Sequence, residues 1–158
     1  MTFENIQCLV YDFDGVMTNN CVYVFEDGRE AVQVNRSDGL AISYLKDHYH
    51  QLILSTETNP VVTKRAQKLG IPVLQGQSNK KHALQEYCEH QGFPLSAVLY
   101  VGNDLNDLDV MMSVGRSCCP SDAVEEIKKR ASFCLQSKGG EGVIRELYDH
   151  LKIKELNP

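Results

Sequence analysis

Short apolar segments alternate along the chain with longer segments in which apolar residues recur at helical spacing. This alternation is typical of a parallel sheet with helices between its strands. We therefore predict an α/β fold, a Rossmann-like parallel sheet with helices on both faces. The predicted strands are Gln7–Asp12, Gln51–Ser55, Val73–Leu74, Val98–Val101, Arg116–Cys119 and Phe133–Leu135.

End signals delimit the helices between these strands. A first helix is predicted over Ser37–His48. Asn59-Pro60 supplies an N-cap followed by a proline at the first helical position, and Gly70 closes that second helix. Ser78 is predicted to cap a third helix, which ends at Gly92.

One insertion interrupts the alternation after the first strand, at about residues 18–35. Two β-rich runs flank Asp27-Gly28, which predicts a β-hairpin. An isolated hairpin is marginally stable in water. This one must therefore pack either against its own domain or against another subunit, because its strands carry the apolar residues Val22, Val24, Ala31, Val32 and Val34.

Length and composition restrict the class of protein. A chain of 158 residues corresponds to one domain, and its net charge of −5 provides no basic surface for nucleic acid. No apolar run reaches the length of a membrane span, so we expect a soluble, cytoplasmic protein with no membrane partner. Six cysteines without metal-binding or C-x-x-C spacing are expected to be reduced core residues: Cys8, Cys21, Cys88, Cys118, Cys119 and Cys134.

The first predicted strand ends in two carboxylates, Asp12 and Asp14. Side chains at positions i and i+2 of an extended chain point the same way, so we expect both carboxylates in one small volume. Two anions so close repel unless a cation neutralises them or one of them is protonated. Mg²⁺, which prefers oxygen ligands, is the expected cation, although an acidic turn without function has the same composition.

Three later segments place polar groups at the ends of strands or the starts of helices. Ser55 and Thr56 supply hydroxyls after a strand, and Lys80 lies at a helix N-terminus, where an anion is also favoured. Asn103, Asp104 and Asp107 form a cluster of oxygen ligands after another strand. Each signal alone is weak, but ligands of open α/β sheets bind at these strand ends.

In this order the segments resemble the four motifs of the haloacid dehalogenase superfamily of phosphotransferases, over nearly the whole chain. The hairpin, the Gln75–Lys80 stretch and the Gly139–Glu146 stretch resemble its subgroup of sugar-acid phosphatases without a cap domain. This resemblance implies a single hydrolase domain over residues 1–158. It also implies a Mg²⁺-dependent phosphoric monoester hydrolase that works through an aspartyl-phosphate.

The resemblance also implies roles for individual residues. Asp12 would be the nucleophile and a metal ligand, and Asp14 the general acid and base, with its backbone carbonyl on the metal. Ser55 and Lys80 would hold the phosphoryl oxygens. The chemistry is reasonable because a covalent intermediate divides one slow hydrolysis into two faster steps.

The last motif departs from the superfamily pattern. Many members have aspartate where this chain has Asn103, which can coordinate Mg²⁺ through its carbonyl oxygen but brings no charge. Asn103 is assigned as the metal ligand with Asp104 as the alternative, and Asp107 as a residue that orients the others.

Substrate choice divides the subgroup. Glu57, Arg65 and Lys68 resemble the pattern of phosphatases that act on 2-keto-3-deoxynononate 9-phosphate, a sialic-acid-type sugar acid. Arg65 and Lys68 could then meet the carboxylate of the substrate from across a subunit interface, although an ordinary charged helix face has the same composition. The alternatives are a 3-deoxy-D-manno-octulosonate 8-phosphate phosphatase, and a non-catalytic assembly module related to the C-terminal domain of acylneuraminate cytidylyltransferases. The subgroup also implies a homo-oligomer, in particular a tetramer, because a site without a cap needs a neighbouring subunit to cover it.

Overall fold

The computed structural model describes residues 3–155, and the side chains of residues 3–151. Its centre is a six-stranded sheet in which all neighbours pair in parallel, in the order β5-β4-β1-β6-β7-β8. All the predicted strands form, at nearly the predicted positions. They are β1 (Cys8–Tyr11), β4 (His50–Leu54), β5 (Val73–Leu74), β6 (Val98–Val101), β7 (Arg116–Cys119) and β8 (Phe133–Cys134).

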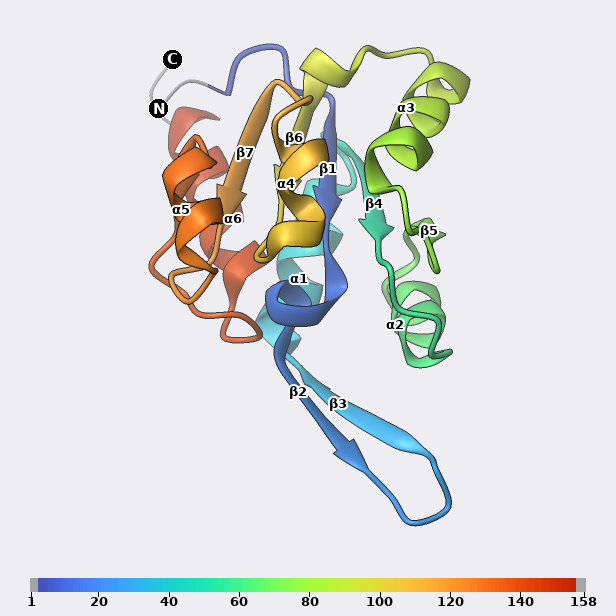
Figure 1. Ribbon diagram of the computed structural model, residues 1–158. Helices are drawn as coiled ribbons and strands as arrows, with labels where there is room; N and C mark the ends of the chain where they lie inside the picture. Colours follow the sequence, from blue (N-terminus) through green and yellow to red (C-terminus); the bar gives the residue numbers. More distant parts are fainter. Residues whose placement is uncertain (1–2, 156–158) are drawn as a thin grey trace.

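Helices cover both faces of the sheet (Figure 1). Strand residues alternate between two cores: Leu9 and Tyr11 of β1 belong to one, and Cys8 and Val10 to the other. The first core is covered by α1 (Arg36–Leu45), α2 (Val61–Leu69) and α6 (Val143–Glu155). The second is covered by α3 (Lys80–Gln91), α4 (Leu108–Met111) and α5 (Glu125–Arg130). The predicted α/β class is confirmed.

The helix ends follow the sequence signals with three corrections. Helix α2 begins at Val61, so its N-cap is Pro60 and not the predicted Asn59, although the Asn59 side chain accepts a 3.0 Å hydrogen bond from the backbone N–H of Val61. Gly70 and Gly92 end α2 and α3 in the left-handed conformation, with φ of 66° and 81°. The cap of α3 is Asn79 and not Ser78, because the Asn79 side chain accepts a hydrogen bond from the backbone N–H of His82. The first helix spans Arg36–Leu45, capped by Asn35, so it begins and ends before the predicted Ser37–His48.

The hairpin consists of β2 (Thr18–Val24) and β3 (Glu30–Val34), paired antiparallel. It projects from the carboxyl edge of the sheet (Figure 1). Val32 and Val34 at its base pack against the first core, whereas Val24 is 68% exposed. The hairpin thus rests on its own domain at the base and is uncovered beyond it. Within the described residues it is the only insertion into the alternating pattern, and they contain no cap domain.

The cysteines only partly follow the expectation of a reduced core. All six are free thiols, but Cys21 and Cys134 are exposed, so the prediction of burial is wrong for these two. Cys21 lies on the hairpin, and Cys134 ends a two-residue strand at the edge of the sheet, where no further strand covers it. No helix in the described part of the chain is long and apolar enough to cross a membrane.

Candidate active site

The polar residues singled out in the sequence meet at the carboxyl edge of the sheet. Asp12 directly follows β1, Ser55 follows β4 and Asn103 lies just after β6, and these three strands are neighbours. They line a cavity of about 220 Å³, to which Asp14, Asn20, Thr56, Asp104 and Asn106 also contribute. This is the position at which open α/β sheets bind ligands.

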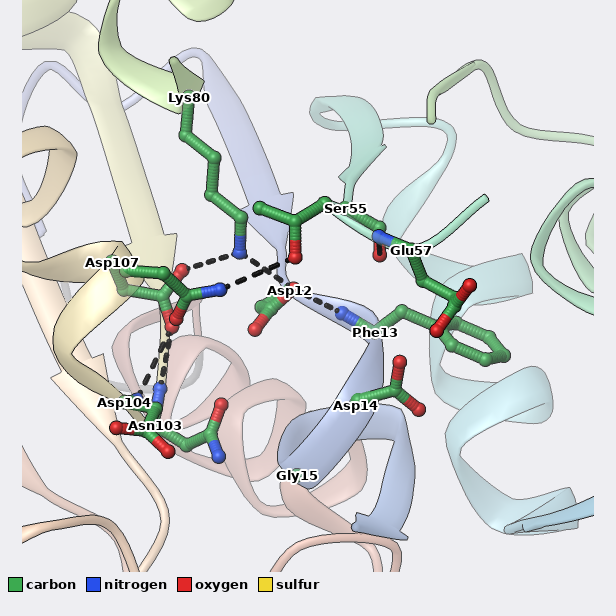
Figure 2. Close-up of polar contacts among 12 residues, drawn as sticks. Asp12, Phe13, Asp14, Gly15, Ser55, Glu57, Lys80, Asn103, Asp104 and Asp107 are labelled. Carbon is green, nitrogen blue, oxygen red and sulfur yellow. Dashed lines mark hydrogen bonds and ion pairs between the residues drawn. The ribbon is translucent and has the colours of Figure 1, made fainter. Parts of the chain in front are cut away.

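Lys80 enters the site from the start of α3 and lies between two carboxylates (Figure 2). Its Nζ is 2.8 Å from Oδ1 of Asp12 and 2.6 Å from Oδ1 of Asp107, and the lysine side chain is 1% exposed. Burial lowers the pKa of Lys80, but the two carboxylates outweigh it and hold that pKa above its ordinary value. The site therefore contains a fixed positive charge beside Asp12.

Asp107 connects this lysine to the loop after β6. Its Oδ1 also accepts a 2.7 Å hydrogen bond from the hydroxyl of Tyr100, and its Oδ2 accepts one of 2.9 Å from the backbone N–H of Asn103. The side chain is fully buried. This geometry fits the orienting role assigned to Asp107. Tyr100 was not predicted from the sequence, where its only signal is a hydroxyl-bearing residue in an otherwise aliphatic strand.

Asp12 is buried and close to other charges. Its Oδ1 accepts a 2.7 Å hydrogen bond from the backbone N–H of Phe13. Burial and the charge of Asp107 raise the pKa of Asp12 to about 8, although Lys80 pulls it down. A cation at Oδ2 would favour the ionised form, which is the form that can attack phosphorus.

A group of oxygen atoms beside Asp12 suits such a cation. One end of the Asn103 amide lies 2.9 Å from the carbonyl oxygen of Asp14 and 3.2 Å from Oδ2 of Asp12. With its nitrogen turned toward them, Asn103 donates two hydrogen bonds. With its oxygen turned toward them, three oxygens converge, which is the donor chemistry that Mg²⁺ requires. These residues therefore fit a magnesium ion.

Two details favour Asn103 over Asp104 as the ligand. Oδ1 of Asp104 accepts a 2.7 Å hydrogen bond from the N–H of Leu105, because Asp104 caps the short 3₁₀ helix Leu105–Asp107. Gly15 makes room for Asn103: a Cβ at this position would lie 2.0 Å from the Asn103 amide, and the φ of +76° also favours glycine.

Asp14 is half-buried and lines the same cavity. Oδ1 accepts a 3.3 Å hydrogen bond from the hydroxyl of Thr18. Burial raises the pKa of Asp14; the charges of Glu57 and Glu30 raise it further, while Thr18 and Lys80 lower it. A carboxyl group with a raised pKa can hold the proton that a general acid must donate.

The segment after β4 brings hydroxyl and carboxylate groups to the site. Ser55 is buried, and its Oγ accepts a 3.1 Å hydrogen bond from the N–H of Glu57. Thr56 is exposed at the rim. Oε1 of Glu57 accepts hydrogen bonds from the N–H groups of Thr58 and Asn59, at 2.6 and 2.8 Å. Glu57 and Asp14 line a second cavity of about 240 Å³, whose other wall is the hairpin.

Arg65 and Lys68 do not reach either of these cavities. Arg65 donates a 3.0 Å hydrogen bond from Nη2 to the carbonyl of Asn35 and lies between α2 and α1. Lys68 is exposed on α2. Within one chain, therefore, the two cations expected at the substrate carboxylate are not brought together with Asp12, because α2 turns them toward α1 and solvent.

Comparisons with known proteins show which family this chain is similar to. A model of the haloacid dehalogenase-like hydrolase family matches residues 32–147. The 3-deoxy-D-manno-octulosonate 8-phosphate phosphatase KdsC of Escherichia coli K12 is 35% identical over 154 residues, which cover 96% of this chain and 82% of the relative.

Two solved structures are also similar. One from Streptomyces avermitilis, described as a HAD family hydrolase, shares 47% identity at a TM-score of 0.90 and covers 93% of this chain and 85% of its own. The other is the 3-deoxy-D-manno-octulosonate 8-phosphate phosphatase of Moraxella catarrhalis, in complex with magnesium, phosphate and KDO. It shares 26% identity at a TM-score of 0.91, over 94% of this chain and 87% of its own.

The family model covers most of the chain, and the curated relatives are phosphatases matched over nearly its full length. Phosphatases of this kind use Mg²⁺ as cofactor, for which the oxygens of Asp12, Asp14 and Asn103 are suited. The chain thus belongs to the haloacid dehalogenase-like hydrolase family, as one of its sugar-acid phosphatases.

Proposed function

We propose that the protein hydrolyses a 2-keto-3-deoxy sugar acid phosphate, in particular a sialic-acid-type nononate 9-phosphate, through an aspartyl-phosphate on Asp12. One observation carries the chemistry: Asp12 is buried at the floor of a cavity, with Lys80 fixed 2.8 Å away and Ser55 beside it. An anionic phosphoryl group entering this cavity would meet a nucleophile and a cation together.

The reaction then has two steps. A carboxylate oxygen of Asp12 forms a bond to phosphorus as the ester oxygen leaves, and Asp14 gives that oxygen its proton. Asp14 next takes a proton from water, whose oxygen attacks phosphorus and releases phosphate and Asp12. Lys80 and Ser55 hold the phosphoryl oxygens throughout. Mg²⁺, when held by Asp12, the Asp14 carbonyl and Asn103, supplies positive charge that offsets the charge of the phosphoryl group.

Glu57 supports the nononate as substrate, since it lines the cavity next to Asp14 where the leaving sugar would lie. Arg65 and Lys68 would serve a carboxylate only from a neighbouring subunit, because neither lines the cavities of its own chain. The octulosonate 8-phosphate is the second candidate, favoured by the 35% identical KdsC relatives. A non-catalytic module is disfavoured because Asp12, Asp14 and Ser55 line one cavity and Lys80 contacts Asp12.

We also propose a homo-oligomer, in particular a tetramer, formed through the hairpin. The end of β2 and the residue that follows it carry four apolar side chains that are about half to two-thirds exposed: Val22, Tyr23, Val24 and Phe25. Adjacent exposed apolar side chains of this kind are typical of an interface.

The test is phosphate release from the nononate 9-phosphate, the octulosonate 8-phosphate and p-nitrophenyl phosphate, each with and without Mg²⁺. We expect Mg²⁺-dependent turnover, with kcat/KM highest for the nononate. A higher kcat/KM for the octulosonate 8-phosphate would show that this compound, and not the nononate 9-phosphate, is the preferred substrate. No phosphate release from any of the three would contradict the catalytic proposal and favour the assembly module. The Asp12→Asn variant measures the background of contaminating phosphatases.

A further inference from the structure

Two thiols lie side by side at the edge of the sheet. Cys119 ends β7, Cys134 ends β8, and the two residues are direct partners in the parallel register. Their sulfur atoms are 3.4 Å apart. Cys119 is buried and Cys134 is exposed, so one thiol of the pair is open to solutes and the other is held directly behind it.

We propose that Cys119 and Cys134 form an oxidisable site, at which a peroxide converts the two thiols into a disulfide. A disulfide bond is about 2.05 Å long, so the sulfurs must approach by roughly 1.4 Å. The local structure permits this movement, because β8 has two residues and pairs with β7 alone at the end of the sheet.

The peroxide is the two-electron oxidant of this reaction. The exposed thiol of Cys134 attacks one peroxide oxygen, the O–O bond breaks, and a sulfenic acid and one water form. The sulfur of Cys119 then attacks the sulfenic sulfur, the S–O bond breaks, and the hydroxyl leaves as a second water with the thiol proton. Two thiols are oxidised by two electrons and one peroxide is reduced.

Exposure decides which thiol reacts first. Burial, and then the hydrogen bond with Cys134, raise the pKa of Cys119 to about 12, so Cys119 is a poor first nucleophile. In the second step Cys119 can react in spite of its raised pKa, because its sulfur already lies 3.4 Å from the sulfur of Cys134. Cys21, the other exposed cysteine, lies on the hairpin and provides a matched control for exposure alone.

The disulfide would tie together two segments that support the active site. The segment after Cys119 donates a 3.0 Å hydrogen bond from the N–H of Val124 to the carbonyl of Asn103. The segment after Cys134 donates one of 3.0 Å from the N–H of Gly140 to the carbonyl of Val16, in the loop that follows Asp12. The two segments also meet directly, through a 3.0 Å hydrogen bond between the Ser121 N–H and the Ser137 carbonyl.

The experiment is titration of the reduced, full-length protein with hydrogen peroxide, followed by intact mass and by mass spectrometry of peptides. We expect a loss of about 2 Da, one cross-linked peptide pair joining Cys119 and Cys134, and full reversal by dithiothreitol. The Cys21→Ser variant should behave as wild type, and the Cys134→Ser variant should lose the cross-link. Overoxidation of Cys134 without a cross-link, or a disulfide that involves other cysteines, would overturn the proposal.

A second measurement tests whether the bond fits the fold. Closing the loop between residues 119 and 134 restricts the unfolded chain, so the oxidised protein should unfold at a higher temperature than the reduced one. A lower midpoint would mean that the disulfide forms only by distorting the sheet, and would contradict the assignment of a built site.

Discussion

The ammonium nitrogen of Lys80 lies 2.6 Å from Oδ1 of Asp107, and both side chains are almost completely buried. The same nitrogen contacts Asp12, so one buried cation balances two buried anions. A buried charge is tolerated only when it is paired, and removal of one partner leaves the others uncompensated. Lys80 is therefore expected to maintain the fold of the site as well as to bind phosphate.

Replacing Lys80 with methionine should reduce the free energy of unfolding by about 3–5 kcal/mol and eliminate phosphate release, since Asp12 and Asp107 lose their cation. Urea unfolding followed by circular dichroism measures the first effect. The neighbouring Lys81 is exposed, so Lys81→Met is the matched control and should leave both quantities nearly unchanged. A Lys80→Met protein as stable as wild type would show that the two carboxylates hold protons instead.

The nucleophile prediction concerns Asp12. Asp12→Asn removes the attacking oxygen while keeping the shape of the side chain, so phosphate release should fall by at least ~10³-fold with the circular dichroism spectrum retained. Asp14→Asn should lose ~10²–10⁴-fold, because it removes a proton donor and not the nucleophile. Asp47→Asn, at an exposed position, is the control. Unchanged turnover in Asp12→Asn would disprove the aspartyl-phosphate.

The metal prediction concerns Asn103. If its neutral amide is a ligand, Asn103→Asp should tighten Mg²⁺ binding in calorimetric titration and lower the Mg²⁺ concentration for half-maximal activity. Asn106→Asp adds the same charge elsewhere in the cavity lining and should have a smaller effect. Unchanged Mg²⁺ affinity in Asn103→Asp, combined with loss of binding in Asp104→Ala, would transfer the ligand role to Asp104.

A pH prediction comes from Asp38, a buried residue of α1. Oδ1 accepts a 2.9 Å hydrogen bond from the N–H of Arg145, while Oδ2 has no hydrogen-bond partner among the described residues. Burial raises the pKa of Asp38 to about 6, although the backbone N–H groups of Arg145 and Ile144 lower it. The folded state therefore binds more protons than the unfolded state between about pH 4 and pH 6, since the unfolded value is about 3.9.

It follows that Asp38 stabilises the fold below pH 4 relative to pH 7, and that its contribution is lost as the pH rises through about 6. The loss is on the order of 2–3 kcal/mol. Asp38→Asn stays neutral, so its free energy of unfolding, measured with urea, should fall less over this range and exceed that of wild type at pH 7. Parallel pH profiles for the two proteins would mean that Asp38 titrates normally.

The strand positions and the residues that follow them could be read from the sequence because both depend on local patterns. Apolar runs mark the buried strands, and in a parallel sheet the carboxyl ends of neighbouring strands necessarily meet. Asp12, Ser55 and Asn103 could therefore be brought together before the structure was known. Lys80 could also be assigned to this site, because it begins α3, the helix that follows β5, and β5 pairs with β4 in the sheet.

Contacts that depend on how helices are set against the sheet could not be predicted. The hydrogen bond between Tyr100 and Asp107 requires the turn after β6 to fold back over that strand. The spacing of apolar residues in the sequence does not predict such a turn. The packing of α2 on α1, which directs Arg65 to the carbonyl of Asn35, was not predicted either, and the expected contact of Arg65 with a substrate across a subunit interface stays a prediction. Cys134 appeared in an apolar run, but only the strand order reveals that β8 lies at an edge.

The last prediction joins assembly to specificity through the hairpin. Tyr23 and Val24 are 67% and 68% exposed, and neither lines the cavity beside Asp14. If hairpins of different subunits pack together, Tyr23→Asp with Val24→Asp should give smaller particles by light scattering, because charge would be buried at the interface. Gln33→Asp adds charge to an exposed position of the other hairpin strand and is the control.

The same double variant should lose more turnover of the sugar acid phosphate than of p-nitrophenyl phosphate. Only the larger substrate would use contacts from the neighbouring subunit, whereas the small ester depends on Asp12, Lys80 and the metal of one chain. Equal losses on both substrates would indicate damage to the site itself. A wild-type monomer that hydrolyses the sugar acid phosphate at full rate would refute a site shared between subunits. Glu57 and the loops around the chain's own cavity would then have to determine substrate specificity.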